Sequence, residues 1–223
     1  MGGYEESVAT LAGELGAVEQ CIRDLDAADW SRITSLAPYD ETAPPWTVKQ
    51  LIAHIDISIG LTLPLLDGPE DGQTGRDRVS FFIADRSQVA PVVYDYAVGL
   101  AGEQSDESLA TKVLDTFEAT LAGARSNPPD TVGSGFFALM RLDEWVPTRT
   151  VEAVVHGLDL TDALDRDPVA TPAGVAATAA ILEELLARRT VAGRPDDLSG
   201  DLEFIRAASG RGPHDDPRFP LIV

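Results

Sequence analysis

The pattern of apolar and polar positions along the chain predicts a series of amphipathic helices. From Glu5 to Leu25, apolar residues recur every three or four positions with charged residues between them, which predicts a helix with one buried face. That face consists of Val8, Leu11, Leu15, Val18, Ile22 and Leu25. Cys21 borders the same stripe, and we interpret it as a small buried hydrophobe rather than a reactive thiol.

A second helix is predicted from Thr47 to about Leu61. Thr47 and Gln50 form a capping-box pattern in front of an apolar run, which is typical of a helix start. Trp46 comes just before this cap, where it can pack as the hydrophobic residue that precedes it. Pro64 and the turn-rich sequence that follows it are expected to end the helix.

The middle of the chain predicts two further helical segments. Apolar residues between positions 79 and 100 favour a helix that Pro91 must kink or divide. A clearer pattern follows Ser105, and the sequence 127–130, which contains two prolines, should end it. The glycines at 133 and 135 lack the strand and helix that surround a phosphate-binding loop, so we expect a turn there.

The last long helix of the predicted bundle spans residues 143–164, with Pro147 in or near its first turn. Long helical segments with almost no alternating strands indicate an all-α four-helix bundle over residues 1–165. Residues 166–223 have a different character, and we expect a short C-terminal helical extension. It contains a helix at 171–189 capped by Thr171, a short helix at 202–208, and a turn-rich tail.

The charge excludes several classes of partner. Lys and Arg number 17 against 37 Asp and Glu, so the net charge is −20. This charge repels phosphate backbones and anionic lipids, and we expect no nucleic-acid and no membrane partner. A single cysteine excludes an internal disulfide framework. No secretory signal is visible at the first residues, and we expect a cytoplasmic protein that is a monomer or a homodimer.

The residues that carry candidate chemistry lie on two of these helices. Glu152 and His156 are four residues apart, so on a helix their side chains stand one turn apart on one face and can reach one divalent cation. His54 lies in the apolar helix that begins at Thr47. Two histidines and one glutamate match a catalytic zinc set that leaves one position open.

Plainer interpretations exist for each of these residues. Acid–base pairs at this spacing are common on helix surfaces, and a histidine in an apolar helix is often a satisfied core residue. Arg149, one turn before Glu152, is either the ion-pair partner of that carboxylate, which we favour, or an anchor for an anionic substrate. We expect His214, in the turn-rich tail, to be a surface residue.

Taken together, these motifs resemble the mycothiol-dependent maleylpyruvate isomerase family, which belongs to the DinB-like superfamily of metal-binding four-helix bundles. The resemblance rests on short motifs: Trp46-Thr47-Val48, Leu51-x-x-His54, Arg149-x-x-Glu152-x-x-x-His156-Gly157-x-Asp159-Leu160, Phe204 to Arg211, and Asp216 to Pro220. In the family, a histidine from one helix and a glutamate and a histidine from a later helix hold zinc. The resemblance implies that His54, Glu152 and His156 are these metal ligands.

The resemblance also implies a reaction. A divalent metal, zinc above all, would activate the thiol of mycothiol for attack on a small-molecule electrophile, in an isomerase or an S-transferase. The isomerase itself carries a C-terminal domain of mixed α/β character, whereas residues 166–223 of this chain predict two helices and a tail. The alternative is a bundle with a stress or regulatory role that binds metal or a ligand without turnover.

Overall fold

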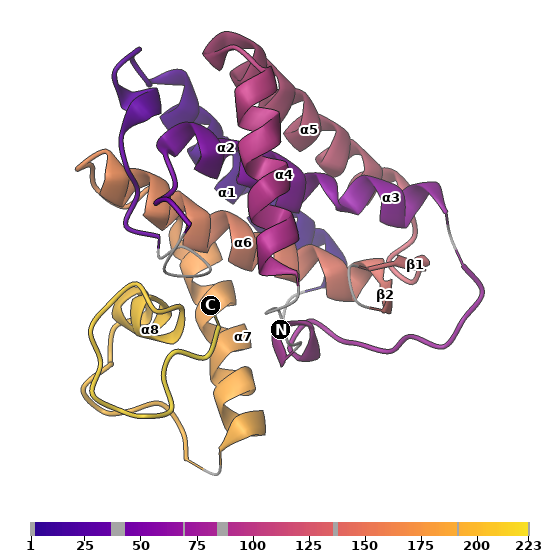
Figure 1. Cartoon of the computed structure of the whole chain (residues 1–223). Helices are drawn as coiled ribbons and strands as arrows, with labels where there is room; N and C mark the ends of the chain where they lie inside the picture. The colour runs from indigo at the N-terminus through magenta and orange to yellow at the C-terminus, as the bar shows by residue number, and fades with distance from the viewer. Residues whose placement is uncertain are drawn as a thin grey trace.

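The computed structural model describes residues 3–36, 43–68, 70–83, 89–135, 138–190 and 192–222. Within these ranges the chain is mostly helical, which confirms the all-α prediction (Figure 1). The α-helices are α1 (Tyr4–Arg23), α2 (Val48–Gly60), α3 (Thr62–Asp67), α4 (Ala90–Glu103), α5 (Asp106–Ser126), α6 (Leu142–Ala163), α7 (Pro172–Arg189) and α8 (Asp201–Ala208). Two 3₁₀ turns and two short strands complete the described elements: Asp29–Ser31, Ser80–Ile83, β1 (Val132–Ser134) and β2 (Leu139–Arg141).

Helices α1, α2, α5 and α6 form the four-helix bundle. α6 packs against α1 and α2, and α5 packs against the same two helices, so each helix has two neighbours in the bundle. α4 packs on the outer side of α2 (Figure 1). The four-helix arrangement predicted from the apolar pattern is therefore the observed one.

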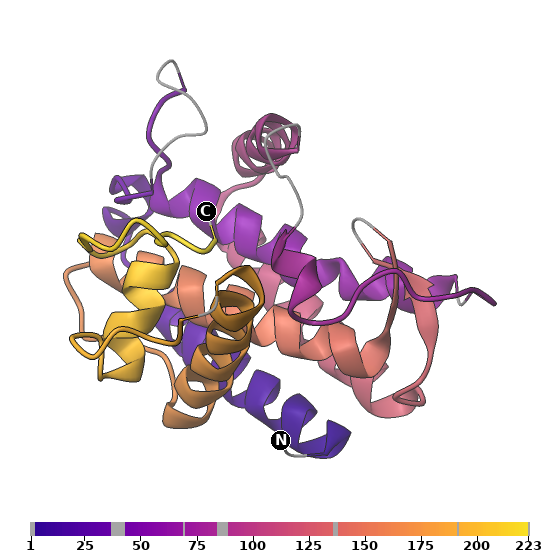
Figure 2. The ribbon, with the colours of Figure 1, turned by 90° about the horizontal axis from the view of Figure 1, so that it is seen from below.

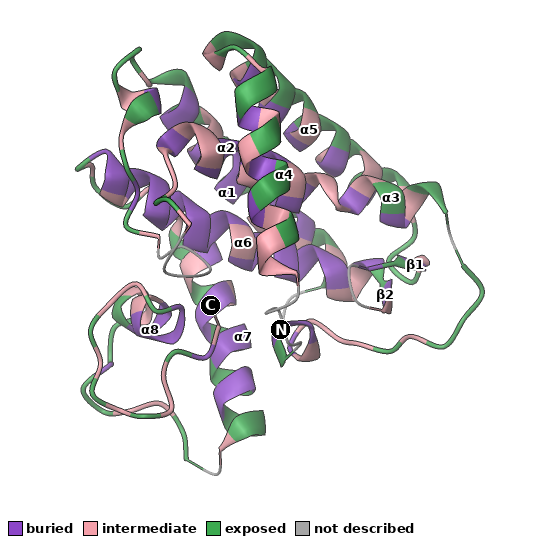
Figure 3. Cartoon of the chain, viewed as in Figure 1, coloured by how far each residue is buried: buried purple, intermediate pink, exposed green. Residues whose placement is uncertain are grey.

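Helix α6 is the most deeply buried element of the bundle (Figure 3). Most of its residues are buried, including the polar side chains of Thr148, Arg149, His156 and Asp159. α7 covers a further side of α6, so the helix is surrounded on more sides than an ordinary surface helix. Buried polar side chains must be satisfied by partners inside the protein. This requirement brings the polar residues of α6 together into a defined site.

The capping predictions at the starts of α2 and α7 are confirmed, and the structure adds a third cap at the start of α5. At the start of α2, the hydroxyl oxygen of Thr47 accepts a hydrogen bond from the Gln50 amide at 3.3 Å, and the Gln50 side-chain oxygen accepts one from the Thr47 amide at 2.8 Å. Ser105 caps α5 by accepting a hydrogen bond from the Ser108 amide. The Thr171 hydroxyl caps α7 in the same way. These caps supply partners for amides that have none within the helix.

Two prolines lie elsewhere than the sequence suggested. The helix that begins at Thr47 was expected to run to about Leu61, and α2 does end at Gly60; Pro64, which was expected to stop it, instead lies in the first turn of α3, which follows directly. A proline is tolerated there because first-turn amides need no partner within the helix. Pro147 was expected in or near the first turn of α6, but it lies inside the helix, one turn further on. Pro91 was expected to kink or divide the segment 79–100; it lies in the first turn of α4, which begins at Ala90, and the described residues before position 84 form the 3₁₀ turn Ser80–Ile83.

The turn expected at Gly133–Gly135 is instead part of a small hairpin. β1 pairs with β2 in antiparallel register, with Gly133 opposite Met140. β1 packs on α3 so closely that a Cβ atom at position 133 would lie 1.9 Å from the carbonyl oxygen of Leu65. Only glycine allows this approach of two backbones.

One segment, Val48–Asp67, is long and apolar enough to cross a membrane by length and composition alone. It corresponds to α2 and α3, and 56% of its most apolar window is buried inside the protein. One such segment is weak evidence for a membrane span, because a mostly buried core helix passes the same test.

The C-terminal extension packs on one side of the bundle (Figure 2). α7 lies against α6 and α1, and α8 lies against α7. Polar contacts add to this packing: the buried carboxylate of Glu14 accepts hydrogen bonds from the backbone amide and the hydroxyl of Thr171. Arg206 binds Asp162 of α6 with both of its terminal nitrogens, at 2.5 and 2.7 Å. The division into residues 1–165 and 166–223 stays a prediction.

Candidate metal centre

Three candidate ligands from two helices converge at the centre of the bundle. His54 comes from α2, and Glu152 and His156 come from α6. Nε2 of His156 lies 3.1 Å from Nε2 of His54 and 3.3 Å from Oε2 of Glu152. One ligand atom from each of the three side chains lies within 4.8 Å of the other two. His54 and His156 are 102 positions apart in the sequence, and the packing of the helices brings them together.

The donor set fits a small divalent cation. Zinc binds imidazole nitrogen and carboxylate oxygen at about 2.0–2.2 Å, so two donors of a tetrahedral site lie about 3.3 Å apart. Both measured separations are close to this value. The three side chains supply one charge and two neutral nitrogen donors and leave a fourth position for another ligand. In the described part of the chain, this is the one cluster of at least three His, Cys, Asp or Glu side chains that converge closely enough to hold a metal ion.

A second set of contacts orients His156. Nδ1 of His156 lies 2.9 Å from Oδ2 of Asp159, which is fully buried. A carboxylate at Nδ1 keeps the proton on that nitrogen, so the lone pair of the neutral ring is on Nε2 and faces His54 and Glu152. Metal-binding histidines commonly have this arrangement. Asp159 therefore prepares His156 to be a ligand.

Arg211 of the C-terminal extension completes this arrangement. Its Nε and Nη2 atoms donate to the two carboxylate oxygens of Asp159, each at 2.9 Å. Asp159 and Arg211 were noted from the sequence only as members of the motifs, without a role. Their pairing could not be found from spacing, because the two residues belong to different segments and are 52 positions apart in the sequence.

The carboxylates control the protonation of the centre. Burial by itself lowers the pKa of His156, but hydrogen bonds with Asp159 and Glu152 outweigh burial, and the net shift is upward. Burial alone raises the pKa of Asp159, but His156 and Arg211 outweigh it and the pKa falls below its usual range. The centre therefore holds an ionised Asp159 beside an imidazole that attracts a proton or a cation.

Arg149 is buried beneath the centre. Its guanidinium lies over the rings of Trp145 and Phe81, 4.3 and 5.1 Å from their centroids, and donates to the carbonyl oxygen of Ser58 at 2.6 Å. Its Nη2 atom is 4.0 Å from Oε1 of Glu152. This position matches the ion-pair role that we favoured from the sequence. The role of substrate anchor stays a prediction.

Aromatic side chains form one wall of the centre. The Trp46 ring meets the His54 ring edge-on, with centroids 5.4 Å apart, and it meets Tyr94 of α4 in the same way at 5.3 Å. The Tyr94 hydroxyl donates to the carbonyl oxygen of Pro44 at 3.0 Å. The sequence placed Trp46 ahead of the cap of α2 but did not place it against His54. The helical period of α2 places Thr47, the residue next to Trp46, two turns before His54. This spacing was the sequence signal that could have placed Trp46 against His54.

The remaining candidates from the sequence lie outside the centre. Cys21 is buried, as predicted, and burial raises the pKa of its thiol. His214 was expected on the surface, but its side chain is only 9% exposed because it packs against Phe219 with ring centroids 4.9 Å apart. His214 is absent from the group of side chains that converge on a cation position.

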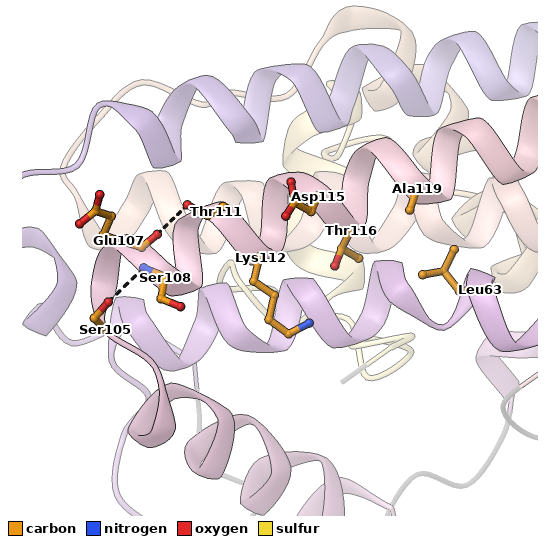
Figure 4. Close-up of a pocket in the computed structure, with 9 residues that line it drawn as sticks. All are labelled: Leu63, Ser105, Glu107, Ser108, Thr111, Lys112, Asp115, Thr116 and Ala119. Carbon is orange, nitrogen blue, oxygen red and sulfur yellow. Dashed lines mark hydrogen bonds between the residues drawn. The ribbon is translucent and has the colours of Figure 1, made fainter.

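A hollow on the outside of α5 is a poor candidate for a ligand-binding site (Figure 4). Its volume is about 660 Å³. Two of its polar side chains are engaged within the protein: Lys112 pairs with the buried carboxylate of Asp56 at 2.8 Å, and Thr116 donates to the same carboxylate at 2.5 Å. Because these polar groups already have partners, they offer little to a ligand.

Comparisons with known proteins agree with this site and fold. The profile of the family described as "Mycothiol maleylpyruvate isomerase N-terminal domain" matches residues 11–161. A search of curated proteins finds no match. Two crystal structures, of a mycothiol-dependent maleylpyruvate isomerase and of a histidine-to-alanine mutant, match with a TM-score of 0.62 at 14% sequence identity. Each match covers 94% of this chain and 90% of the other.

The structural likeness shows a shared fold, and the uncovered part of this chain is so small that the match extends into the C-terminal extension. The family match spans most of the chain and includes all three candidate ligands. The DinB-like bundle expected from the motifs is therefore the observed fold. The chain belongs to the mycothiol maleylpyruvate isomerase N-terminal domain family.

Proposed function

We propose that this protein is a divalent-metal-dependent enzyme that uses mycothiol as a thiol cosubstrate, in an isomerase or an S-transferase reaction on a small electrophile. The observation that carries this proposal is the convergence of His54, Glu152 and His156 on one cation position; three protein ligands would leave a tetrahedral ion one further position for a thiol. Family membership supports mycothiol as the thiol. We expect the protein to act in the cytoplasm, without nucleic acid or membrane, as a monomer or a homodimer.

Each residue of the centre has a defined task in this proposal. The two histidines and the glutamate hold the cation, for which zinc fits best. Once bound, a divalent ion lowers the pKa of a coordinated thiol, so that the thiolate is present at neutral pH. Asp159 keeps the proton of His156 on Nδ1, and Arg211 keeps Asp159 ionised. Arg149 balances part of the charge of Glu152.

The two reaction types differ in the fate of the thiol. In an isomerisation, the thiolate adds to a conjugated carbon, the carbon–sulfur bond forms, and the electron pair of the double bond moves to the carbonyl oxygen. After rotation about the resulting single bond, the thiolate leaves and the double bond re-forms, so no thiol is consumed. In an S-transfer, the thiolate displaces a leaving group or opens an epoxide, and the thiol is consumed. Consumption of thiol therefore separates the two.

The test is an assay of zinc-loaded protein with mycothiol and a panel of electrophiles that includes maleylpyruvate. Product analysis and thiol titration are both recorded. We expect activity that requires both metal and thiol, and we expect His156→Ala to lose bound zinc and activity together. Cys21→Ser is the matched control and should retain bound zinc and activity, because Cys21 is a buried residue of α1 and is not one of the three candidate ligands.

Zinc-loaded protein that binds the metal tightly but converts no electrophile with any thiol would overturn the proposal. That result would favour the alternative of a binding protein with a stress or regulatory role. Activity that persists without thiol, with water as the nucleophile, would also overturn it, since zinc sites with one open position activate water equally well.

A further inference from the structure

A second hollow lies in the C-terminal extension, on residues that take no part in the metal centre. It has a volume of about 350 Å³, which is within the range of small-molecule sites, roughly 300–1,000 Å³. Its walls combine two prolines with three carboxylates and one imidazole: Pro195, Asp197, Pro213, His214, Asp215 and Asp216. A group of acidic residues alone would carry no inference, but the imidazole adds an independent observation.

Among the described residues, the imidazole of His214 has a hydrogen-bond partner at one of its two ring nitrogens. Its Nδ1 atom accepts a hydrogen bond from the backbone amide of Asp216 at 2.9 Å, and its ring packs against Phe219. Its side chain is 9% exposed. Among the residues that the structure describes, Nε2 of His214 is a buried polar atom without a hydrogen-bond partner. The carboxylate of Asp197 is the near neighbour, but at 3.7 Å it is beyond hydrogen-bond distance.

The contact at Nδ1 decides what Nε2 can do. A backbone amide can only donate, so Nδ1 must be the nitrogen without a proton. In the neutral ring the proton is then on Nε2, a donor that lies beside Asp197, and both residues line the hollow. A buried donor without an acceptor is costly, and native proteins rarely leave one. The hollow therefore lacks an acceptor at this point.

The walls exclude most kinds of ligand. A metal ion needs a lone pair, which Nε2 does not have in this tautomer. An anion is repelled by the carboxylates of Asp197 and Asp215, because among the described residues neither is paired with an arginine or lysine in the way that Asp216 is paired with Arg218. An ammonium group satisfies the carboxylates but has no lone pair for Nε2–H. A hydroxyl group can both accept from His214 and donate to a carboxylate.

We propose that this hollow binds a neutral ligand that carries several hydroxyl groups, of the size of a single sugar ring. One hydroxyl oxygen bridges His214 and Asp197, since atoms 3.7 Å apart leave room for an oxygen at about 2.8 Å from each. Asp197 is 76% exposed, so its side chain can turn aside to admit the ligand. Pro195 and Pro213 supply apolar surface for the C–H faces of the ring.

The test follows the imidazole of His214 by NMR while the probe is added to the full-length protein. The probes are glucose and a methyl glucoside as sugars, with acetate, ammonium and zinc as the excluded classes. We expect saturable shifts of the His214 signals with a sugar, at equal affinity in zinc-loaded and chelated protein. Acetate and ammonium should give no saturable shift of these signals, and zinc should shift only the signals of the metal centre.

Two variants and a control make the result specific. His214→Asn keeps an acceptor near the amide of Asp216 but removes the Nε2 donor, and we expect sugar affinity to fall about tenfold or more. Asp197→Ala should weaken the sugar by about fivefold. The neighbouring Asp196→Ala does not line the hollow and should leave binding unchanged. Melting curves verify that all three variants fold.

Three outcomes overturn the proposal. The first is the absence of a saturable shift with either sugar up to about 50 mM, well above the millimolar affinity expected of so small a ligand. The second is an unchanged affinity in His214→Asn. The third is zinc binding at His214, which would show that the tautomer is the reverse of the one inferred. None of these results bears on the metal centre, because the variants leave its three ligands and Arg211 in place.

Discussion

Arg211 and Asp159 are joined by two parallel hydrogen bonds of 2.9 Å that link the C-terminal extension to the metal centre. Asp159 in turn contacts Nδ1 of His156 at 2.9 Å. A residue of the extension therefore acts on a candidate metal ligand of the bundle through one intervening carboxylate. The extension thus contributes a residue, Arg211, to the contacts that orient His156.

We expect Arg211→Lys to weaken zinc binding by about 10- to 100-fold, the range usual for the loss of a contact that orients a metal-binding histidine. Lysine cannot reproduce the paired, planar contact with both oxygens of Asp159. Zinc affinity measured by competition with a chromophoric chelator is the readout.

Arg206→Lys is the matched control for this change. Arg206 binds Asp162 with the same two-point geometry and also joins the extension to α6, but Asp162 touches none of the three ligands. Its replacement should leave zinc affinity within about twofold. Equal losses in the two variants would mean that the extension acts only through overall packing.

Removal of the metal is expected to lower the melting temperature without unfolding the helices. The bundle has an extensive core of its own and buries apolar residues in every helix. Bound zinc at about 100 times its dissociation constant adds about 2.7 kcal/mol, which chelation removes. Circular dichroism at 222 nm with and without chelator measures both quantities. Loss of helicity on chelation would make the metal structural and count against an open catalytic site.

Zinc binding should release protons, and its affinity should fall as the pH falls. In the metal-free protein, contacts with Asp159 and Glu152 raise the pKa of His156 above its ordinary value of about 6.5. A raised pKa in the folded state stabilises the metal-free protein below pH 6.5, and this contribution is lost as the pH rises through the folded pKa. Zinc must displace that proton. Calorimetry in two buffers of different ionisation enthalpy should show more proton release at pH 6.5 than at pH 8.5.

The carboxylate of Glu14 provides a test of how the extension is attached. Burial raises its pKa, and the hydrogen bonds from Thr171 offset only part of this effect. The folded state therefore holds the proton more tightly than the unfolded state. The contribution of Glu14 is most favourable below its unfolded pKa of about 4.3 and is lost as the pH rises through the folded value.

Glu14→Gln should remove this dependence, because the amide oxygen still accepts the hydrogen bonds from Thr171 but carries no charge. We expect the variant, compared with the natural protein, to gain stability in urea unfolding at pH 7 relative to pH 4.5. Glu19→Gln, on the exposed side of the same helix, is the control and should show a much smaller difference. A loss of stability at both pH values would show that the charge itself holds the extension.

Much of the bundle was determined by local features of the sequence. Apolar residues at helical spacing gave α1, α5 and α6 within a residue or two of their observed bounds, since the period of a helix is a local property of the sequence. Local hydrogen bonds decided the starts of α2 and α7, so Thr47 and Thr171 could be assigned as caps. The pair formed by Glu152 and His156 also follows from helix geometry alone.

Contacts between distant segments decided the rest. The sequence supplied His54 as a candidate, but only the packing of α2 against α6 brings its Nε2 to 3.1 Å from that of His156. The strand at Gly133 forms by pairing with β2, and α3 approaches it more closely than any side chain at position 133 permits. The side chain of His214 is largely covered because its ring packs against Phe219 within the tail, and Arg211 reaches Asp159 because the extension packs on the bundle. Periodicity reports which face of an element is apolar, whereas the neighbour of that face is selected by packing over the whole chain, and this selection built the metal centre.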